Sequence, residues 1–420
     1  MKHLLITNTW LQSPGGTEGI VRDLTRAWHR RGDRVTVYSP RLGAIADALR
    51  AEGIAVTDTL ASLSAPPDLI HGHHNLETMT ALLRFPGTPA LYHCHGYDPW
   101  QEQAPRHPRI LRYLAISDRV AGRVHEHTGL PRDHIHLVFN YADPAVFRPH
   151  RDTPAARPAR AVIYDRYLNP DETALIQSAC LAAGITCTRF ADLHPPVARP
   201  EDLLPHFDLV FAVGKSAIEA MACGAAVILC TGGAMGELVT GENAAAWQRR
   251  NFTAIGDHLP VTTERVAAQL AACTPERAAA ATAFIREHAT FASFLRAIDA
   301  HHDAVLRDAA TRPAPDRAAE AAAEAQFLEW VNTFLAAQIH DAHVHRDART
   351  ALAAERDHLL AELRRTTAER DHATAQRDAI TATTSWRLRT ALLNLPVIGS
   401  LLERLGRRAG STGNNHRIPE

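Results

Sequence analysis

Short apolar segments rich in β-branched residues alternate with amphipathic segments along most of the chain. HLLIT at 3–7 and RVTVYSP at 34–40 have the length and residue types of strands. The segment between them has apolar positions at helical spacing and ends at Gly32. Strands that alternate with helices in this way are typical of parallel β-α-β units. We therefore predict an α/β protein with doubly wound sheets.

The same pattern predicts the other elements of this part of the chain. Strands are expected at 68–74, 89–96, 114–118, 134–140, 161–165, 185–190, 208–214 and 225–230. Helices are expected at 18–30, 43–53, 76–84, 109–114, 118–128, 171–183, 216–222 and 276–308. A Pro- and Arg-rich segment, FRPHRDTPAARPAR, interrupts the series. We expect two Rossmann-like lobes, 1–150 and 151–310, with a cleft between the carboxyl ends of their sheets, where such folds bind ligands.

The last part of the chain has a different pattern. TRPAPD at 311–316 has the composition of a linker, and 317–383 is rich in Ala, Glu, Arg and His, as expected for one long helix. A seven-residue repeat from Ala354 suggests a coiled coil and self-association through 317–383, although its weak core leaves a solvated single helix as an alternative. In the tail, 384–420, apolar residues are flanked by arginines. We expect peripheral membrane contact through 384–410, or packing on the body of the protein.

Composition narrows the class and location of the protein. The formal net charge of -1 and the pI near 7.1 give no electrostatic signature of a nucleic-acid binder. Six cysteines lie in apolar runs and form no CxxC pair, as in reduced cytoplasmic proteins. The sequence contains no run of ~18 apolar residues, which is the length needed to span a bilayer. Its N-terminal apolar run is too short for a signal peptide. We expect a cytoplasmic protein, at most peripheral at the inner face of the membrane.

Lys215 is one of only two lysines in the chain, and it stands at the junction of an expected strand and an expected helix. The junction is not a P-loop, because Leu209 stands where that motif requires a glycine. The free N–H groups of a helix N-terminus nevertheless bind phosphate. Gly214 lets an anion approach, Ser216 can cap the helix, and Lys215 adds a charge. A plain surface lysine is the alternative.

Glu219 follows Lys215 by about one helical turn, so both side chains can face the same cleft. A carboxylate there could accept two hydrogen bonds from a ribose diol, as acidic residues do in other nucleotide-binding folds. An ordinary surface glutamate is the alternative, but the apolar neighbours of Glu219 disfavour it.

The segment SAIEAMACGAAVILCTGGAMGELVTGEN resembles the donor-binding segment of GT-B glycosyltransferases, especially those of family four. PGGTEGIVRDLTRAWHRRGDRVTVYSP resembles the glycine loop, first helix and second strand of that family. PDLIHGHH, ALYHCHG, AISDRVAGRV and HLVFNYADPAVFRP are similar to its later landmarks, in the same order. The resemblance covers roughly residues 1–308. It implies the GT-B fold, with an acceptor-side domain at 1–150 and a nucleotide-sugar-binding domain, including a closing helix, at 151–310.

This resemblance also implies a chemistry. A hexosyl group would move from a nucleotide-diphosphate sugar to a cell-envelope glycan or a glycolipid acceptor, in a metal-independent, retaining reaction without a further cofactor. On the matching motifs, His95 would lie near the transferred sugar and Glu219 would hold the ribose. The GG-x-x-x-E turn, Gly232 to Glu237, would contact the donor phosphates and sugar. We thus expect His95 and Glu237 to be catalytic. Residues expected to bind the donor are Gly15, Gly16, Arg166, Gly214, Lys215, Ser216, Glu219, Gly232 and Gly233.

Two positions depart from the pattern of that family. Phe211 stands where the first of two paired glutamates would contact the transferred sugar, which leaves the sugar and the choice between retention and inversion open. Arg166 matches the arginine of an Arg/Lys pair, but Asp171 stands at the lysine position. We hypothesise that Lys215 supplies the missing cation from the other side of the diphosphate.

Two other functions share this architecture. A sugar-nucleotide epimerase would need acid and base groups at the sugar, for which the sequence offers no convincing set. A degenerate transferase could act as a scaffold through its C-terminal helix. The histidines of HGHH (71–74) and HCH (93–95) have a spacing that a metal could use. Strand alternation points His71 and His73 to one face and His74 to the other, and we expect packed or polar histidines and no metal.

Overall fold

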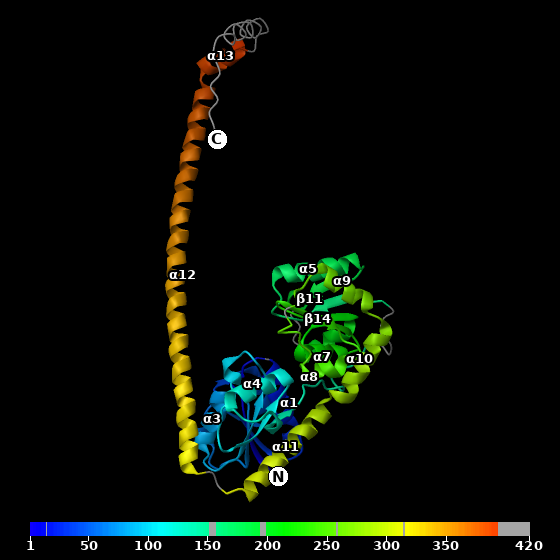
Figure 1. The fold of residues 1–420 in the computed structure, drawn as a ribbon. Coiled ribbons are helices and arrows are strands. Elements are labelled where there is room, and N and C mark those ends of the chain that lie inside the picture. Colours follow the sequence, from blue (N-terminus) through cyan, green and yellow to red (C-terminus); the bar gives the residue numbers. More distant parts are fainter. Residues whose placement is uncertain (14, 151–156, 194–198, 258, 314–315, 394–420) are drawn as a thin grey trace. The chain divides into compact units, whose positions relative to one another are not determined.

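The computed structural model describes the chain except for residues 14, 151–156, 194–198, 258, 314–315 and 394–420. The chain forms two compact units, Met1–Glu329 and Trp330–Glu420. The first unit contains two α/β lobes, and the second contains most of one long helix (Figure 1). The predicted α/β fold is confirmed.

A seven-stranded parallel sheet with the order β5-β3-β1-β6-β7-β8-β9 forms the first lobe. Because all its strands are parallel, their carboxyl ends lie at the same edge. The strands are β1 His3–Thr7, β3 Arg34–Tyr38, β5 Ala55–Thr57, β6 Leu69–Gly72, β7 Ala90–Cys94, β8 Ile110–Ala115 and β9 Ile135–Leu137, with a separate pair, β2 Trp10–Leu11 and β4 Arg41–Leu42. The helices are α1 Gly16–Arg30, α2 Ala44–Ala51, α3 Asn75–Arg84 and α4 Asp118–Thr128, and the short 3-10 helices are η1 Leu60–Ser62, η2 Trp100–Glu102 and η3 Arg132–His134.

Both faces of this sheet are covered, which explains why its strands are continuous apolar runs. Leu4 and Ile6 of β1 pack with Trp28 of α1 on one face. Leu5, which points the other way, packs in a second core with Tyr92 of β7. Alternate residues of one strand thus enter two different cores.

The second lobe has a five-stranded sheet with the order β11-β10-β12-β13-β14, in which β14 alone is antiparallel. Its strands are β10 Arg160–Ile163, β11 Thr186–Arg189, β12 Leu209–Ala212, β13 Ala226–Thr231 and β14 Ala234–Leu238. Its helices are α5 Pro170–Ala182, α6 Pro200–Leu203, α7 Gly214–Ala222, α8 Ala244–Arg249, α9 Thr263–Ala272 and α10 Pro275–His288, with 3-10 helices η4 Phe190–Asp192 and η5 Leu204–His206.

Two of the predicted helices are wrong in type or extent. We expected a helix at 109–114, but residues 110–114 belong to β8, Ile110–Ala115. A strand buried on both faces shows no period of two, and the arginines beside its apolar residues imitate an amphipathic helix. The segment 276–308 forms two helices, because α10 ends at His288 and Thr290 caps the start of α11. The hydroxyl of Thr290 accepts a hydrogen bond from the amide of Ser293.

Helix α11, Phe291–Thr311, packs in the first lobe rather than in the second, to which we had assigned it. Its residues Phe294, Ile298 and Val305 are buried in the core that also contains Trp28. The indole N–H of Trp28 donates to Asp299 Oδ1 at 3.0 Å. The chain therefore returns to the first lobe after completing the second (Figure 1).

The long helix α12, Arg317–Ala382, begins on the first lobe. Arg109 is 3% exposed, and its guanidinium donates to the carbonyls of Leu82, Phe85 and Thr88 and pairs with Glu320 at 2.9 Å. The guanidinium thereby satisfies carbonyl groups at the end of α3 and holds the first turn of α12.

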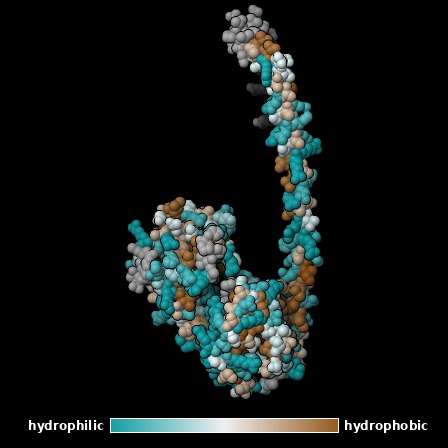
Figure 2. All heavy atoms as spheres, turned by 180° about the vertical axis from the view of Figure 1, so that it is seen from behind, coloured by the Kyte–Doolittle hydropathy of each residue, from teal (hydrophilic) through white to brown (hydrophobic). Residues whose placement is uncertain are grey.

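In the second unit, α12 continues as a single helix and is followed by α13, Thr384–Leu393. The repeat positions that we expected to form a coiled-coil core are exposed, among them Leu352, Leu359 and Ile380. Figure 2 shows hydrophobic side chains at intervals along this helix, separated by hydrophilic ones. Self-association stays a prediction. Among the described residues, no helix is long and apolar enough to cross a membrane, and 394–420 of the expected tail lie outside these residues.

Candidate functional site

A cavity of about 530 Å³ opens where the central strands of the first lobe end. Residues that follow β1, β6 and β7 form its wall together with the N-terminus of α1 and the loop after β10 of the second lobe. The carboxyl ends of parallel strands are where folds of this kind bind ligands. Gly15, Gly16, His74, His95, Glu102 and Arg166 are among the residues that line the cavity.

Two glycines place the N-terminus of α1 against this cavity. Gly15 precedes the helix in an extended conformation and offers no side-chain cap, so the first amides of α1 keep their donor capacity. A side chain at Gly15 would collide with the carboxylate of Glu18. A Cβ atom at Gly16 would meet no heavy atom within 4 Å, because this residue faces the open cavity. The loop thus leaves room for a ligand beside a positive helix end.

His95 and Glu102 form the buried floor of the cavity. The backbone N–H of His95 donates to Glu102 Oε2 at 2.8 Å. Burial alone would raise the pKa of the Glu102 carboxyl, but the hydrogen bond and charge of His74 hold it below its usual value. Burial, helped by His93, lowers the pKa of His95 well below its usual value. A charged carboxylate and a neutral imidazole therefore lie side by side at physiological pH.

His74 has a strained backbone, with φ at 65° and ψ at 146°, a region that residues with a side chain seldom adopt. Its Nδ1 lies 3.1 Å from the amide nitrogen and 2.9 Å from the hydroxyl of Thr9, and its Nε2 lies 3.5 Å from Glu102 Oε1. Burial lowers the pKa of His74, but Glu102 and Glu77 raise it above the usual value overall. Sequence reasoning missed both His74 and Glu102. Backbone strain is not visible in a sequence, and nothing marks Glu102 within its loop.

The second lobe contributes a tight loop after β10. Asp165 Oδ1 accepts the amide of Tyr167 at 2.7 Å, and its Oδ2 accepts the hydroxyl of Thr231 at 2.9 Å. A Cβ atom at Gly232 would lie 2.3 Å from the carbonyl oxygen of Tyr167, so only glycine fits there. These contacts hold Arg166 and Tyr167 at the wall of the cavity.

The GG-x-x-x-E turn is placed differently from our expectation. Gly233 has a positive φ of 73°, and its amide donates to Glu172 Oε1 at 2.7 Å. Glu237 is exposed on β14, where its Oε1 accepts the indole N–H of Trp247 at 3.1 Å. Neither Gly233 nor Glu237 lines the cavity. Gly232 does not line it either, but packs against the backbone of Tyr167, which does.

Lys215 lies at the junction of the two lobes, not in bulk solvent. Its ammonium donates to the carbonyl of Tyr141 at 3.0 Å, lies 4.3 Å from the centre of that ring, and pairs with Glu219 at 3.2 Å. The hydroxyl of Tyr141 in turn donates to Asp23 of α1 at 2.9 Å. Burial raises the pKa of Glu219 above its usual value, although Lys215 opposes the shift. One polar chain thus connects α1 with α7.

The predicted donor-binding residues therefore fall into two groups. Gly15, Gly16, His95 and Arg166 come together on the cavity. The others, Gly214, Lys215, Ser216, Glu219, Gly232, Gly233 and Glu237, do not line it. Ser216 is also not the helix cap, because α7 begins at Gly214, which has a φ of 60°.

Behind His95 lies a contiguous cluster of buried histidines. The rings of His71 and His73 stack at 4.6 Å, which confirms their predicted common face, and those of His73 and His95 stack at 4.8 Å. His93 of β7 lies 5.8 Å and 5.4 Å from the rings of His71 and His73, and His302 of α11 approaches His71 across the core. Burial lowers the pKa of His93 and of His302 to about 3, so these rings are neutral.

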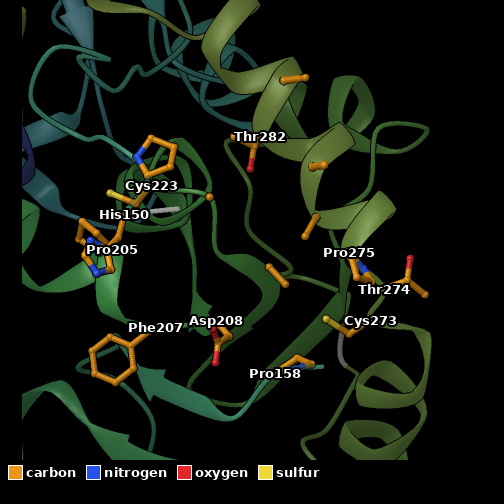
Figure 3. A pocket seen from close by; sticks show the side chains of 16 residues that line it. His150, Pro158, Pro205, Phe207, Asp208, Cys223, Cys273, Thr274, Pro275 and Thr282 are labelled. Atoms are coloured by element: carbon orange, nitrogen blue, oxygen red, sulfur yellow. The ribbon is translucent and has the colours of Figure 1, made fainter. Parts of the chain in front are cut away.

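A second, smaller cavity of about 200 Å³ lies at the amino ends of β12 and β13, opposite to the strand ends where a ligand is expected (Figure 3). Cys223, Cys273 and several alanine and proline side chains line it. The carboxylate of Asp208 at its edge already accepts the amides of Ala159 and Arg160. It is mostly apolar and does not offer the polar groups of the first cavity.

The sequence-family model of Glycosyltransferase Family 4 matches residues 14–146, within the first lobe. No curated protein sequence matches the chain significantly. Among solved structures, a glycosyltransferase from Rickettsia africae superposes with a TM-score of 0.55 at 14% identity, over 73% of this chain and 99% of that one. Alr3699/HepE from Anabaena, solved with UDP and glucose, has a TM-score of 0.51 at 17% identity, over 72% of this chain and 100% of that one.

The chain has the GT-B fold. The resemblance seen in the sequence is thus confirmed as a fold, and the family-four match is confined to the lobe that carries Gly15, Gly16 and His95. The long C-terminal helix is an addition to the matched region, since the matched structures cover about three quarters of this chain.

We predict that Lys215→Ala lowers the free energy of unfolding by about 3 kcal/mol, because it leaves the buried Glu219 carboxylate without its partner. A group whose pKa is raised by folding contributes stability below its usual pKa, here 4.5, and this contribution is lost as pH rises through the folded pKa. Without Lys215 the pKa of Glu219 rises further. The free energy of unfolding of Lys215→Ala should therefore fall further below that of Lys215→Ala/Glu219→Gln as the pH rises from about 4 to about 8, as measured by urea titration. A pH-independent difference between the two variants would contradict this assignment.

Proposed function

We propose that the protein transfers a sugar from a nucleoside-diphosphate sugar to an acceptor hydroxyl. The cavity at the strand ends carries this proposal, because it combines a helix N-terminus with Arg166 and with the polar pair His95 and Glu102. A diphosphate needs the first two groups and a sugar needs hydrogen-bonding groups such as the last two. The structural neighbour from Anabaena was solved with UDP and with UDP-glucose, which supports a donor of this class.

In the proposed reaction, the acceptor oxygen bonds to the anomeric carbon and its proton passes to the departing diphosphate oxygen, while the bond from the anomeric carbon to that oxygen breaks. Negative charge then develops on the leaving diphosphate. The positive end of α1, open at Gly16, and the guanidinium of Arg166 are placed to stabilise this charge without a metal ion at the phosphates. Retention of configuration rests only on the resemblance to family four.

His95 and Glu102 are proposed to bind the transferred sugar. The charged Glu102 accepts the amide of His95, and this contact fixes the end of β7 at the cavity wall. The catalytic role we expected for His95 is kept in the proposal. Glu237 is not assigned to the sugar, because its carboxylate, on β14, accepts the indole N–H of Trp247 on α8.

Lys215 is proposed to serve the donor site indirectly. A direct grip on the diphosphate would require it to leave the Tyr141 carbonyl and Glu219. Its contacts instead support a role in keeping Glu219 charged and oriented, so that this carboxylate can receive the ribose diol.

We predict that Gly16→Ala weakens donor binding at least about tenfold, because the new methyl group would occupy the space beside the helix end. Gly19→Ala is the matched control: it lies on the same helix, is buried away from the cavity, and also meets no atom within 4 Å. Both variants should keep the thermal midpoint of the wild type or exceed it, since alanine favours the helix. A thermal-shift panel of UDP- and GDP-sugars, followed by calorimetry, measures the effect.

Arg166→Ala should weaken the same donor by about 1.5–3 kcal/mol, the range of a charged hydrogen bond. Equal donor affinity in wild type, Gly16→Ala and Arg166→Ala would place the donor elsewhere. If no sugar nucleotide raises the thermal midpoint of the protein, the proposed function is wrong.

Two alternatives give different outcomes with the same donor. An epimerase would incorporate solvent deuterium into the sugar without an acceptor, and Glu18 and Glu102 in the cavity are the carboxylates it would use. A transferase incorporates none. A non-catalytic scaffold would neither transfer nor hydrolyse the donor, whereas a transferase should hydrolyse it slowly and lose this activity in His95→Ala.

The acceptor is proposed to be a cell-envelope glycan or a lipid-linked sugar at the inner face of a membrane. Helix α13 supports this part of the proposal, because it exposes Trp386, Leu388 and Leu392. Arg389 lies over the ring of Trp386, 5.6 Å from its centre. Exposed apolar side chains beside arginines are typical of helices that lie on anionic membranes.

We predict that the protein sediments with vesicles that contain anionic lipid, less so in high salt, and not with purely zwitterionic vesicles. Trp386→Ala/Leu388→Ala should reduce this binding, whereas Leu359→Ala/Leu363→Ala, exposed on α12, should not. Equal sedimentation of both double variants would exclude α13 as the contact.

A further inference from the structure

The histidine cluster behind the cavity leaves ring nitrogens without hydrogen-bond partners in a fully buried environment. Among the described residues, none bonds to Nε2 of His71, to Nε2 of His73, or to either ring nitrogen of His93. These three side chains are 0% exposed. Buried polar atoms are nearly always satisfied by protein, water or an ion, so these neighbouring nitrogens call for an occupant.

The two nitrogens on the outer sides of His71 and His73 are, in contrast, engaged. His71 Nδ1 lies 2.9 Å from Nε2 of His302, and His73 Nδ1 lies 2.6 Å from Nε2 of His95. If each inner Nε2 is an acceptor, each outer Nδ1 carries the proton and donates it to the neighbouring imidazole. This is the arrangement of metal-binding histidines, which donate their second ring N–H to an outer acceptor that fixes tautomer and ring orientation.

We propose that His71, His73 and His93 form a buried site for a divalent metal ion of the Zn²⁺ class. One ring nitrogen from each residue lies within 4.8 Å of the others. For bonds of about 2.1 Å in tetrahedral geometry the nitrogens must approach to about 3.4 Å, which side-chain rotation within the cluster must supply. Three neutral imidazoles suit Zn²⁺, Co²⁺, Ni²⁺ or Cu²⁺ rather than Mg²⁺ or Ca²⁺.

The surroundings support a site that is enclosed by aromatic side chains. The ring of Trp28 lies 5.7 Å from His71 and 5.0 Å from His302, and Phe294 lies 6.1 Å from His93. His71 of β6 and His93 of β7 come from two adjacent parallel strands, whose pairing fixes their spacing, and His73 follows β6 directly. The proposal differs from our expectation of packed or polar histidines without a metal.

An ion there would also orient the cavity. A metal on His73 Nε2 leaves the proton on His73 Nδ1, which donates to His95 Nε2, so the proton of His95 must be on its Nδ1. The ion would thus set the tautomer of a residue that lines the cavity without touching any ligand there. The inference concerns binding by the chain itself, and it can be tested independently of sugar transfer.

The test uses the full chain, denatured in the presence of a chelator and refolded with either Zn²⁺ or Co²⁺. We expect about one tightly held ion per chain, a raised thermal midpoint, and the intense visible absorption of four-coordinate Co²⁺ with nitrogen ligands. The chain has 25 histidines, so stoichiometry alone does not locate the ion. His73→Asn and His93→Asn should each abolish tight binding and the visible bands.

Three further variants make the result decisive. His302→Asn keeps all three ligands and should weaken binding about 10- to 100-fold, since only an outer partner is lost. His107→Asn removes the other group of potential ligands, His107 with Glu320 and Glu324, and should change nothing. His343→Asn is an exposed control on α12. Refolded wild type without bound ion or Co²⁺ bands, or binding that disappears in His107→Asn but persists in His93→Asn, would overturn the proposal, even if the ligand variants fail to fold.

Discussion

The parallel pairing of β1, β6 and β7 is the constraint on which the site depends. It aligns the carboxyl ends of three strands, so that Thr9, His74 and His95 meet although the sequence separates them widely. The same pairing puts His71, His73 and His93 on one face of neighbouring strands. Helix α1 adds its N-terminus at this edge because it follows β1 in the chain after only the short strand β2. The cavity and the histidine cluster behind it are therefore two products of one register.

The second constraint is the polar chain between the lobes, from Asp23 through Tyr141 and Lys215 to Glu219. Lys215 is more than a charge beside a helix. Its ammonium satisfies a backbone carbonyl, an aromatic face and a buried carboxylate, and an arginine would be too large and too planar to reproduce this set. The rarity of lysine in this chain is thus matched by a position with unusual demands.

Much of the fold could be predicted from the sequence, because apolar runs and glycine stops report burial and turns directly. The strand 3–7 and the helix 118–128 have the predicted bounds. The failures have physical reasons. The strand at 110–115 is buried on both faces and shows no period of two, and Thr290 interrupts a pattern that continues smoothly in residue type.

The residues that we expected from the sequence reach the cavity only where a motif reports the backbone conformation. Gly15, Gly16, His95 and Arg166 follow strands or open a helix, and they reach the cavity. Glu102 and His74 act through tertiary contacts and through a strained φ, which no local pattern encodes. Glu237 does not line the cavity, because its position depends on β14 running antiparallel to β13, a property of the sheet rather than of the motif.

Helix α11 has a consequence for how the chain matures. It contributes Phe294, Ile298 and His302 to the interior of a lobe whose other members are encoded before residue 150. During synthesis, the apolar surface of the first lobe that α11 covers stays exposed until the whole second lobe and α11 have left the ribosome. An amino-terminal fragment that ends between the lobes would therefore lack α11 and expose part of its core. We expect the chain to depend on chaperones chiefly while the second lobe is being synthesised.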